Sequence, residues 1–132
     1  MIQTRAPKEF SEMASRMILN KLMYIPAKYN IPVCLPGIGF DCWGFVRYLF
    51  SLDGINLPAT PIAARKMFKE INMPIYRDVL MVRPVDVFRA VHVGFMESRD
   101  IVLHCSDTYG GVMRTKVENF IGEKSFYRLI CV

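Results

Sequence analysis

The stretch GFDCWGFVRYLF, residues 39–50, decides the fold of this chain. Asp41 is a strong helix N-cap, so the pattern predicts a helix whose first residue is Cys42. Phe40 precedes the cap and Phe45 occupies the fourth helical position, which is the arrangement of a hydrophobic staple. The staple fixes the path by which the chain enters the helix. The core face of this helix consists of apolar residues at helical spacing, namely Phe45, Val46, Leu49 and Phe50.

Cys42 occupies a position where a helix can activate a thiol. The first turn of a helix carries unpaired N–H groups and the positive end of the helix dipole, and both favour the nucleophilic thiolate. In the same turn, Gly44 leaves room for a substrate to approach. Trp43 either lines the substrate cleft or packs in the core. Position alone leaves an ordinary buried cysteine as an equal alternative.

His92 lies in AVHVGF, residues 90–95, on a predicted strand. Alternation places His92 and Gly94 on the same face, and a glycine in a strand often marks the close approach of another group. A cysteine at a helix start that faces a histidine on a sheet is an arrangement for nucleophilic catalysis, in which the imidazole takes the thiol proton. The sequence therefore predicts Cys42 as nucleophile and His92 as base, although a histidine among apolar residues is more often a satisfied core residue.

His104 is the other histidine of the chain and lies on the next predicted strand. A hairpin would bring it near His92, whose ring it would orient as the third member of a triad. The alternative is a polar strand residue without a role. A zinc site built from Cys42, His92, His104 and Cys105 is disfavoured, because adjacent residues of a strand point to opposite faces. We therefore expect no metal and no cofactor.

The rest of the chain predicts an α+β fold. Helical spacing covers residues 8–25, Gly54 is expected to end the helix that starts at Cys42, and a third short helix begins after the cap Thr60 and ends at Pro74. The predicted strands are Val85 to Ala90, Val91 to Glu97, Ile101 to Cys105, Val112 to Val117 and Phe126 to Val132. Helices followed by closely spaced strands predict N-terminal helices packed on an antiparallel sheet of five to six strands.

Composition limits the classes of function. The 132 residues, 52% of them hydrophobic, predict a single domain over residues 1–132. The net charge of +5 is scattered, which is typical of a solvated surface, and we expect no nucleic-acid partner. The apolar runs are too short for a membrane span, and the first residues lack a signal peptide, so we expect synthesis in the cytoplasm without one. The spacing of the cysteines disfavours disulfides, and Cys105 and Cys131 are expected to be apolar fillers.

A set of motifs resembles the NlpC/P60 family of cell-wall cysteine peptidases. The ordered motifs, spread over about residues 31–129, are FDCWGFVRYLF, GINLP, RPVDVFRA, HVGFMES, VLHCSDTYGGVMR and FYRL. The resemblance implies a papain-like α+β fold, with Cys42 as nucleophile, His92 as base and His104 as the orienting third residue. It also implies hydrolysis of amide bonds in peptidoglycan stem peptides, commonly the bond after a γ-linked D-glutamate, without a cofactor or metal.

Departures from the family pattern indicate a branch. Trp43 stands where the family usually has serine, and this feature and the closing FYR, Phe126 to Arg128, resemble the phage and prophage tail branch. That branch implies a place in the virion tail or delivery to the periplasm or cell wall, with other tail-tip proteins as partners. The tyrosine that the family commonly carries upstream of the cysteine is missing, and Val33 stands there instead. The alternatives are a weakly active or inert structural subunit of a tail tip, and a delivered cell-wall amidase acting as a toxin or lysin.

Overall fold

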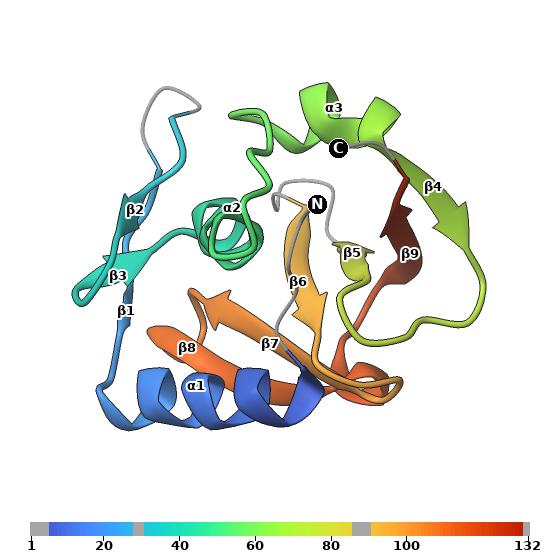
Figure 1. Ribbon diagram of the computed structural model, residues 1–132. Helices are drawn as coiled ribbons and strands as arrows, with labels where there is room; N and C mark the ends of the chain where they lie inside the picture. The colour runs from blue at the N-terminus through green and yellow to red at the C-terminus, as the bar shows by residue number, and fades with distance from the viewer. Residues whose placement is uncertain (1–5, 28–30, 86–90, 131–132) are drawn as a thin grey trace.

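A curled, mixed sheet forms the framework of the described part of the chain (Figure 1). The computed structural model describes residues 6–27, 31–85 and 91–130. The helices are α1 (Pro7–Leu19), α2 (Cys42–Ser51) and α3 (Pro61–Ala64), with the 3-10 turns η1 (Arg65–Met67) and η2 (Val117–Asn119). The strands are β1 (Met23–Tyr24), β2 (Cys34–Leu35), β3 (Gly39–Phe40), β4 (Phe68–Ile71), β5 (Val79–Arg83), β6 (His92–Met96), β7 (Ile101–Ser106), β8 (Gly111–Lys116) and β9 (Glu123–Leu129).

The sheet corrects the expectation of five to six antiparallel strands. Nine strands among the described residues follow the order β2-β3-β1-β8-β7-β6-β5-β9-β4. β1 and β3 run parallel, whereas the other neighbouring pairs are antiparallel. β1, β2 and β3 have two residues each, which is too short to show the alternation that marks a strand in sequence.

The later strands agree in part with the predicted ones. β6, β7 and β8 lie where alternation predicted strands, and β9 begins slightly earlier than its predicted segment. The strand predicted from Val85 to Ala90 falls mostly on residues 86–90, which lie outside the described residues. The observed strand β5 comes just before it, at Val79–Arg83.

The helix that starts at Cys42 is confirmed in detail. The Asp41 side chain accepts a hydrogen bond from the Gly44 N–H at 2.9 Å, so Asp41 is the N-cap. The rings of Phe40 and Phe45 lie 5.2 Å apart, as the predicted staple requires. The helix ends at Ser51 (its last residue), and Gly54 turns the chain with a φ of 81°. The helix packs on β6 and β7 (Figure 1).

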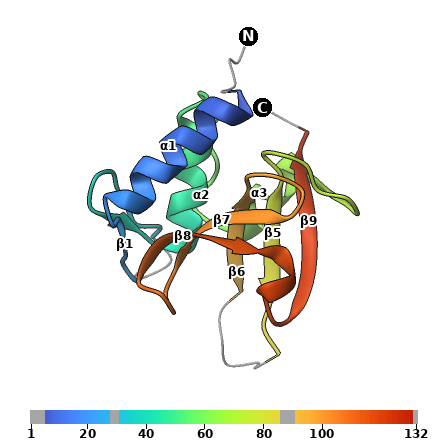
Figure 2. The same cartoon turned by 90° about the horizontal axis from the view of Figure 1, so that it is seen from below.

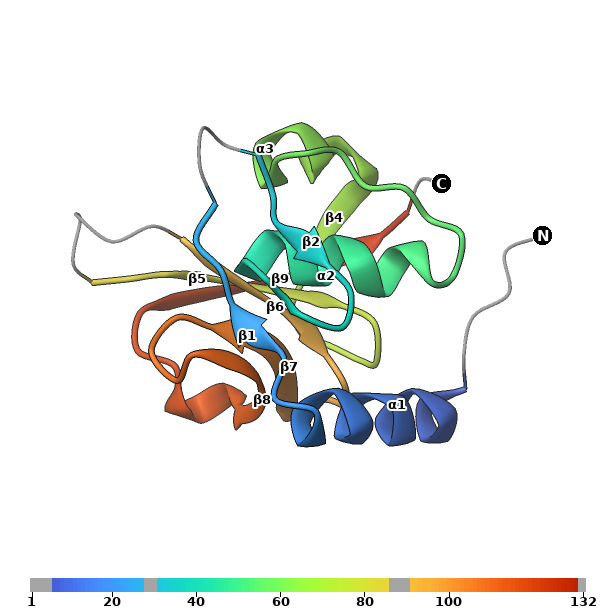
Figure 3. The ribbon, with the colours of Figure 1, turned by 90° about the vertical axis from the view of Figure 1, so that its left-hand side faces the viewer.

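The other two helices are shorter than expected. α1 ends at Leu19 rather than near residue 25, and Lys21 takes a positive φ of 55° before the chain enters β1. α3 begins at the predicted cap Thr60, but β4 replaces the rest of the predicted helix because it pairs with β9. α1 lies along β8, and α3 lies at the other end of the molecule, beyond α2 (Figures 2 and 3). No helix in the described ranges is long and apolar enough to cross a membrane.

The two faces of the sheet bury different clusters. One cluster lies under the helices and includes Val93 and Phe95 of β6. The other lies on the opposite face and includes Met96, with Phe120 packed against it. Because residues alternate along a strand, His92 belongs to the face of Met96 rather than to that of Val93.

Candidate active site

Cys42 opens onto a large cleft. This cleft has a volume of about 1050 Å³ and is lined by Cys42, Asp41 and Trp43 at the start of α2, by Tyr24 and by residues around α3. Its floor is one face of the sheet, to which four strands contribute. The floor residues include Phe68 and Glu70 of β4, Val79, Met81 and Arg83 of β5, Val93 of β6, and Ser125 and Tyr127 of β9. A bound peptide can therefore lie along the sheet and reach the Cys42 thiol.

The Cys42 thiol is protonated in the resting protein. Burial raises the pKa of Cys42 to about 11, and the charges of Asp41 and Asp107 raise it further. Hydrogen bonds from the backbone N–H groups of Val93 and Trp43 lower this pKa, but they do not offset the burial. The expectation of a thiolate at the helix tip is therefore wrong for the resting state, because desolvation outweighs the first helical turn.

The two histidines are joined directly. His92 Nε2 lies 2.8 Å from His104 Nδ1, and the two rings meet edge to face. Burial lowers the pKa of both residues, that of His104 to about 3 with a contribution from His92. The charge of Asp107 partly offsets the shift at His92. Both imidazoles are therefore neutral at pH 7, which is the state in which His92 can accept a proton.

The Cys42 thiol contacts β6 next to His92, the residue of that strand that carries the imidazole. The Val93 N–H bonds the Cys42 thiol, and Val93 follows His92 in the chain. The His92 ring itself lies with His104 and Phe120, and it is not among the side chains that line the cleft. Among the described residues, the hydrogen bond of His92 goes to His104 rather than to Cys42.

The family assignment follows from comparison with known proteins. The profile of the NlpC/P60 family matches residues 28–130. The chain belongs to the NlpC/P60 family. Members of this family are generally cell-wall hydrolases of the cysteine peptidase or amidase type. No curated protein matches the sequence.

Solved NlpC/P60 structures share the fold. NlpC2 from Trichomonas vaginalis superposes with a TM-score of 0.73 at 16% identity, over 96% of this chain and 48% of its own. A lipoprotein-like NLP/P60 family protein from Staphylococcus aureus gives 0.67 at 16% identity, over 98% of this chain and 44% of its own. The present chain therefore spans less than half the length of either solved chain.

Gly44 and Gly94 each have a packing reason. A Cβ at Gly44 would meet the Val33 carbonyl oxygen and the Asp41 carboxylate, both of which belong to the helix cap and the loop that it holds. A Cβ at Gly94 would meet the side chain of Val102 and lie 3.4 Å from the Cβ of His104. The absence of a side chain at these positions lets the cap form and lets β7 bring His104 to His92.

Trp43 lies both in the core and at the wall of the cleft. Its side chain is 5% exposed and belongs to the main core, and its indole N–H donates to the Pro58 carbonyl at 3.1 Å. It also lines the cleft beside Cys42.

Tyr24 also lines the cleft of this NlpC/P60 domain, although no pattern in the sequence pointed to it. It lines the cleft with Cys42, and β1 holds it beside β3 through the pairing of Tyr24 with Phe40. Burial, followed by the charges that Cys42 and Asp107 carry when ionised, raises the pKa of Tyr24 to about 12. Its hydroxyl therefore keeps its proton and can donate a hydrogen bond in the cleft. Tyr24 precedes the matched residues 28–130, so no family motif pointed to it.

Two further cysteines of the described residues, Cys34 and Cys105, are free thiols. Cys105 is fully buried, as expected for a filler, and its thiol donates to the Phe40 carbonyl at 3.2 Å. Cys105 and His104 serve opposite faces of the sheet, as the argument against a zinc site requires. Cys34 is exposed, and Cys131 lies outside the described residues.

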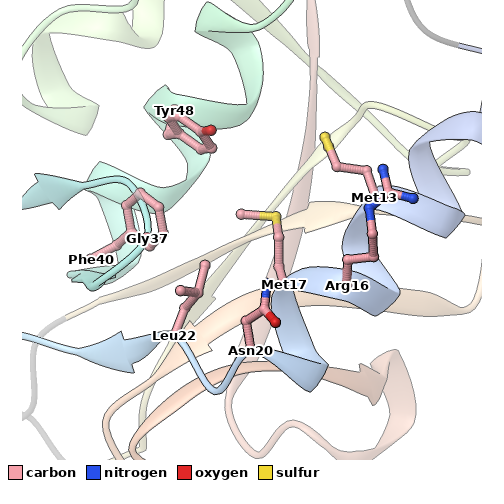
Figure 4. Close-up of a pocket in the computed structure, with 8 residues that line it drawn as sticks. All are labelled: Met13, Arg16, Met17, Asn20, Leu22, Gly37, Phe40 and Tyr48. Carbon is pink, nitrogen blue, oxygen red and sulfur yellow. The ribbon is translucent and has the colours of Figure 1, made fainter.

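A second, smaller hollow lies away from the thiol. It has a volume of about 240 Å³ and opens between α1, α2 and the turn at Gly37 (Figure 4). Figure 4 shows Met13, Met17 and Arg16 on α1 and Tyr48 on α2. It contains none of the predicted site residues.

Proposed function

We propose that this NlpC/P60 domain, residues 1–132, is a cysteine peptidase that hydrolyses amide bonds in peptidoglycan stem peptides. The proposed bond is the one that follows a γ-linked D-glutamate. Cys42 is the nucleophile, His92 the base and His104 the residue that positions His92. Trp43 lies at the cleft as a substrate contact, while Gly44 and Gly94 supply the space that the site needs.

The observation that carries this proposal is the arrangement of three side chains. Cys42 begins a helix and lines a peptide-sized cleft, the N–H of Val93 bonds its thiol, and the neighbouring His92 lies 2.8 Å from His104. Acyl transfer by a cysteine peptidase needs a nucleophile, a base that takes its proton, and a third group that orients the base.

In the proposed mechanism the proton moves only when a substrate is bound. His92 Nδ1 takes the thiol proton as the sulfur attacks the carbonyl carbon, so the neutral pair becomes a thiolate–imidazolium pair for a short time. The Cys42 backbone N–H and the Tyr24 hydroxyl, which lines the same cleft, would donate to the developing oxyanion. The imidazolium then protonates the leaving amine, which leaves a thioester at Cys42. Water, deprotonated by His92, hydrolyses the thioester and releases the acid.

The proposed setting is a phage or prophage tail. The sequences DCWGF and FYR support this setting, because they resemble the tail branch of the family. The protein would act in the virion tail, or in the periplasm or cell wall after delivery, together with other tail-tip proteins.

One specific observation favours a second candidate, a structural tail-tip subunit with weak or no activity. The Cys42 thiol is protonated at neutral pH, with a pKa of about 11. A cell-wall amidase delivered as a toxin or lysin would use the same site as the first proposal.

Digestion of purified muropeptides tests the proposal. Wild-type protein is expected to yield two new fragments whose masses sum to that of the substrate plus one water. The fragment masses identify the bond that was cut. A wild-type protein that leaves all muropeptides intact would instead support the structural subunit.

A further inference from the structure

The hydrogen-bond chain that begins at His92 continues beyond His104. His104 Nε2 lies 2.8 Å from Thr115 Oγ1, and His104 Nδ1 lies 2.8 Å from His92 Nε2. The three side chains come from the neighbouring strands β6, β7 and β8. Both ring nitrogens of His104 therefore have a partner within the protein.

Packing keeps water away from the middle of this chain. His104 is 3% exposed, and the ring of Phe120 lies 5.0 Å from that of His104 and 6.0 Å from that of His92. Gly94 permits the close approach of β7, because a side chain there would meet Val102 and His104. A buried ring nitrogen that lost its protein partner would thus remain unsatisfied, which is costly.

Two directions of hydrogen bonding fit these distances. In the first, His92 Nε2–H donates to His104 Nδ1, and His104 Nε2–H donates to the Thr115 hydroxyl. In the second, the Thr115 hydroxyl donates to His104 Nε2, and His104 Nδ1–H donates to His92 Nε2. A threonine hydroxyl can act in either way, because it both donates and accepts.

Only the first direction leaves His92 able to act as a base. There the proton of neutral His92 is on Nε2, so Nδ1 has a free lone pair for the thiol proton. In the second direction Nδ1 already carries the proton of the neutral ring, and Nε2 is blocked by the N–H of His104. The imidazolium form needs a proton on both nitrogens of His92, which the second direction excludes.

We infer that Thr115 is a positioning residue, which accepts the Nε2 proton of His104 and so keeps Nδ1 of His92 free. The role of His92 in this inference rests on the proposed function. The tautomers of His92 and His104, however, are properties of the folded chain that exist with or without catalysis.

Two variants with opposite chemistry test the inference. Thr115→Val keeps the shape of the side chain and removes the hydroxyl, whereas Thr115→Ser keeps the hydroxyl. The chain has two histidines, so ¹⁵N chemical shifts of the imidazole nitrogens in the full-length labelled protein report on His92 and His104 alone. Muropeptide hydrolysis supplies kcat and KM for the same samples, and thermal unfolding reports whether each variant is folded.

We expect both histidines of the wild-type protein to carry their proton on Nε2 at pH 7. Thr115→Val should move the His104 proton to Nδ1, because a buried N–H without an acceptor is poorly tolerated. It should also lower kcat by about 10- to 100-fold, the cost of one unsatisfied buried group, with little change in KM. Thr115→Ser should restore the wild-type tautomers and most of kcat.

Several results would overturn the inference. A wild-type His104 with its proton on Nδ1 would do so without any variant, so the test stands even if Thr115→Val does not fold. Wild-type tautomers in a folded Thr115→Val protein would also do so, since a merely structural role changes the unfolding temperature alone. If the tautomers respond as expected but wild-type protein cleaves nothing, the positioning role stands and the proposed function fails.

Discussion

His92 Nε2 and His104 Nδ1 lie 2.8 Å apart, although twelve positions separate the two residues in the sequence. The β6–β7 hairpin produces this contact, because Phe95 pairs with Leu103 and the register carries Gly94 opposite His104. The two imidazoles thus share one face of the sheet, whereas Val93, between His92 and Gly94, faces the core and the thiol. This alternation places the His92 side chain on the face opposite to that of Val93, whose N–H reaches the Cys42 thiol.

The ionisation of Cys42 gives a first prediction. A thiol with a pKa of about 11 is a poor nucleophile at pH 7. Alkylation of Cys42 by iodoacetamide should therefore accelerate about tenfold for each pH unit between 7 and 10, as the thiolate fraction rises. Mass mapping of the modified peptides measures the rate at Cys42 separately from that at the exposed Cys34. A rate at Cys42 that is already constant from pH 7 upward would show that the resting thiol is ionised.

The hydroxyl of Tyr24 gives a second prediction. Because it lines the cleft beside Cys42 and keeps its proton, Tyr24→Phe should lower kcat by roughly tenfold or more through loss of one donor to the oxyanion. Tyr109→Phe is the matched control, since Tyr109 is 74% exposed. Hydrolysis rates of the two variants on the same muropeptide make the comparison. Equal rates would remove Tyr24 from the mechanism.

The buried histidines predict how stability depends on pH. The pKa of His104 falls from its ordinary value of 6.5 to about 3 on folding, and that of His92 is also lowered. At a pH between 3 and 6.5, His104 binds a proton in the unfolded chain but not in the folded chain. The free energy of unfolding therefore falls as the pH decreases below 6.5. Protonation of His104 in the unfolded chain alone should lower the free energy of unfolding by about 2 kcal/mol as the pH falls from 6.5 to 5.

Urea unfolding at several pH values measures this dependence, with His104→Asn as the comparison. The variant should show a shallower loss of stability over the same pH range. Identical slopes for the two proteins would mean that His104 is protonated in the folded state.

Local sequence signals predicted the helix that starts at Cys42 and the proximity of the two histidines. The cap at Asp41 and the staple of Phe40 and Phe45 act within a few residues, so the sequence specifies them directly. The proximity of His92 and His104 followed from a hairpin with a short turn. These features depend little on the rest of the fold.

Features that depend on distant pairing were not predictable in this way. β1 pairs with β3 and with β8, both far from it in the sequence, and these pairings bring Tyr24 to the cleft. The segment of β4 falls within the predicted third helix, between Thr60 and Pro74, but pairing with β9 draws it into the sheet. The protonation of Cys42 also depends on burial by remote residues, which the position at a helix start does not reveal.

The central claim is that Cys42 attacks a stem-peptide amide with His92 as its base. Mass analysis of muropeptides digested by wild-type, Cys42→Ala and His92→Ala proteins tests it most directly. The account predicts cleavage by the wild-type protein and a loss of several orders of magnitude in rate for each folded variant. Cleavage by Cys42→Ala at the wild-type rate would contradict it.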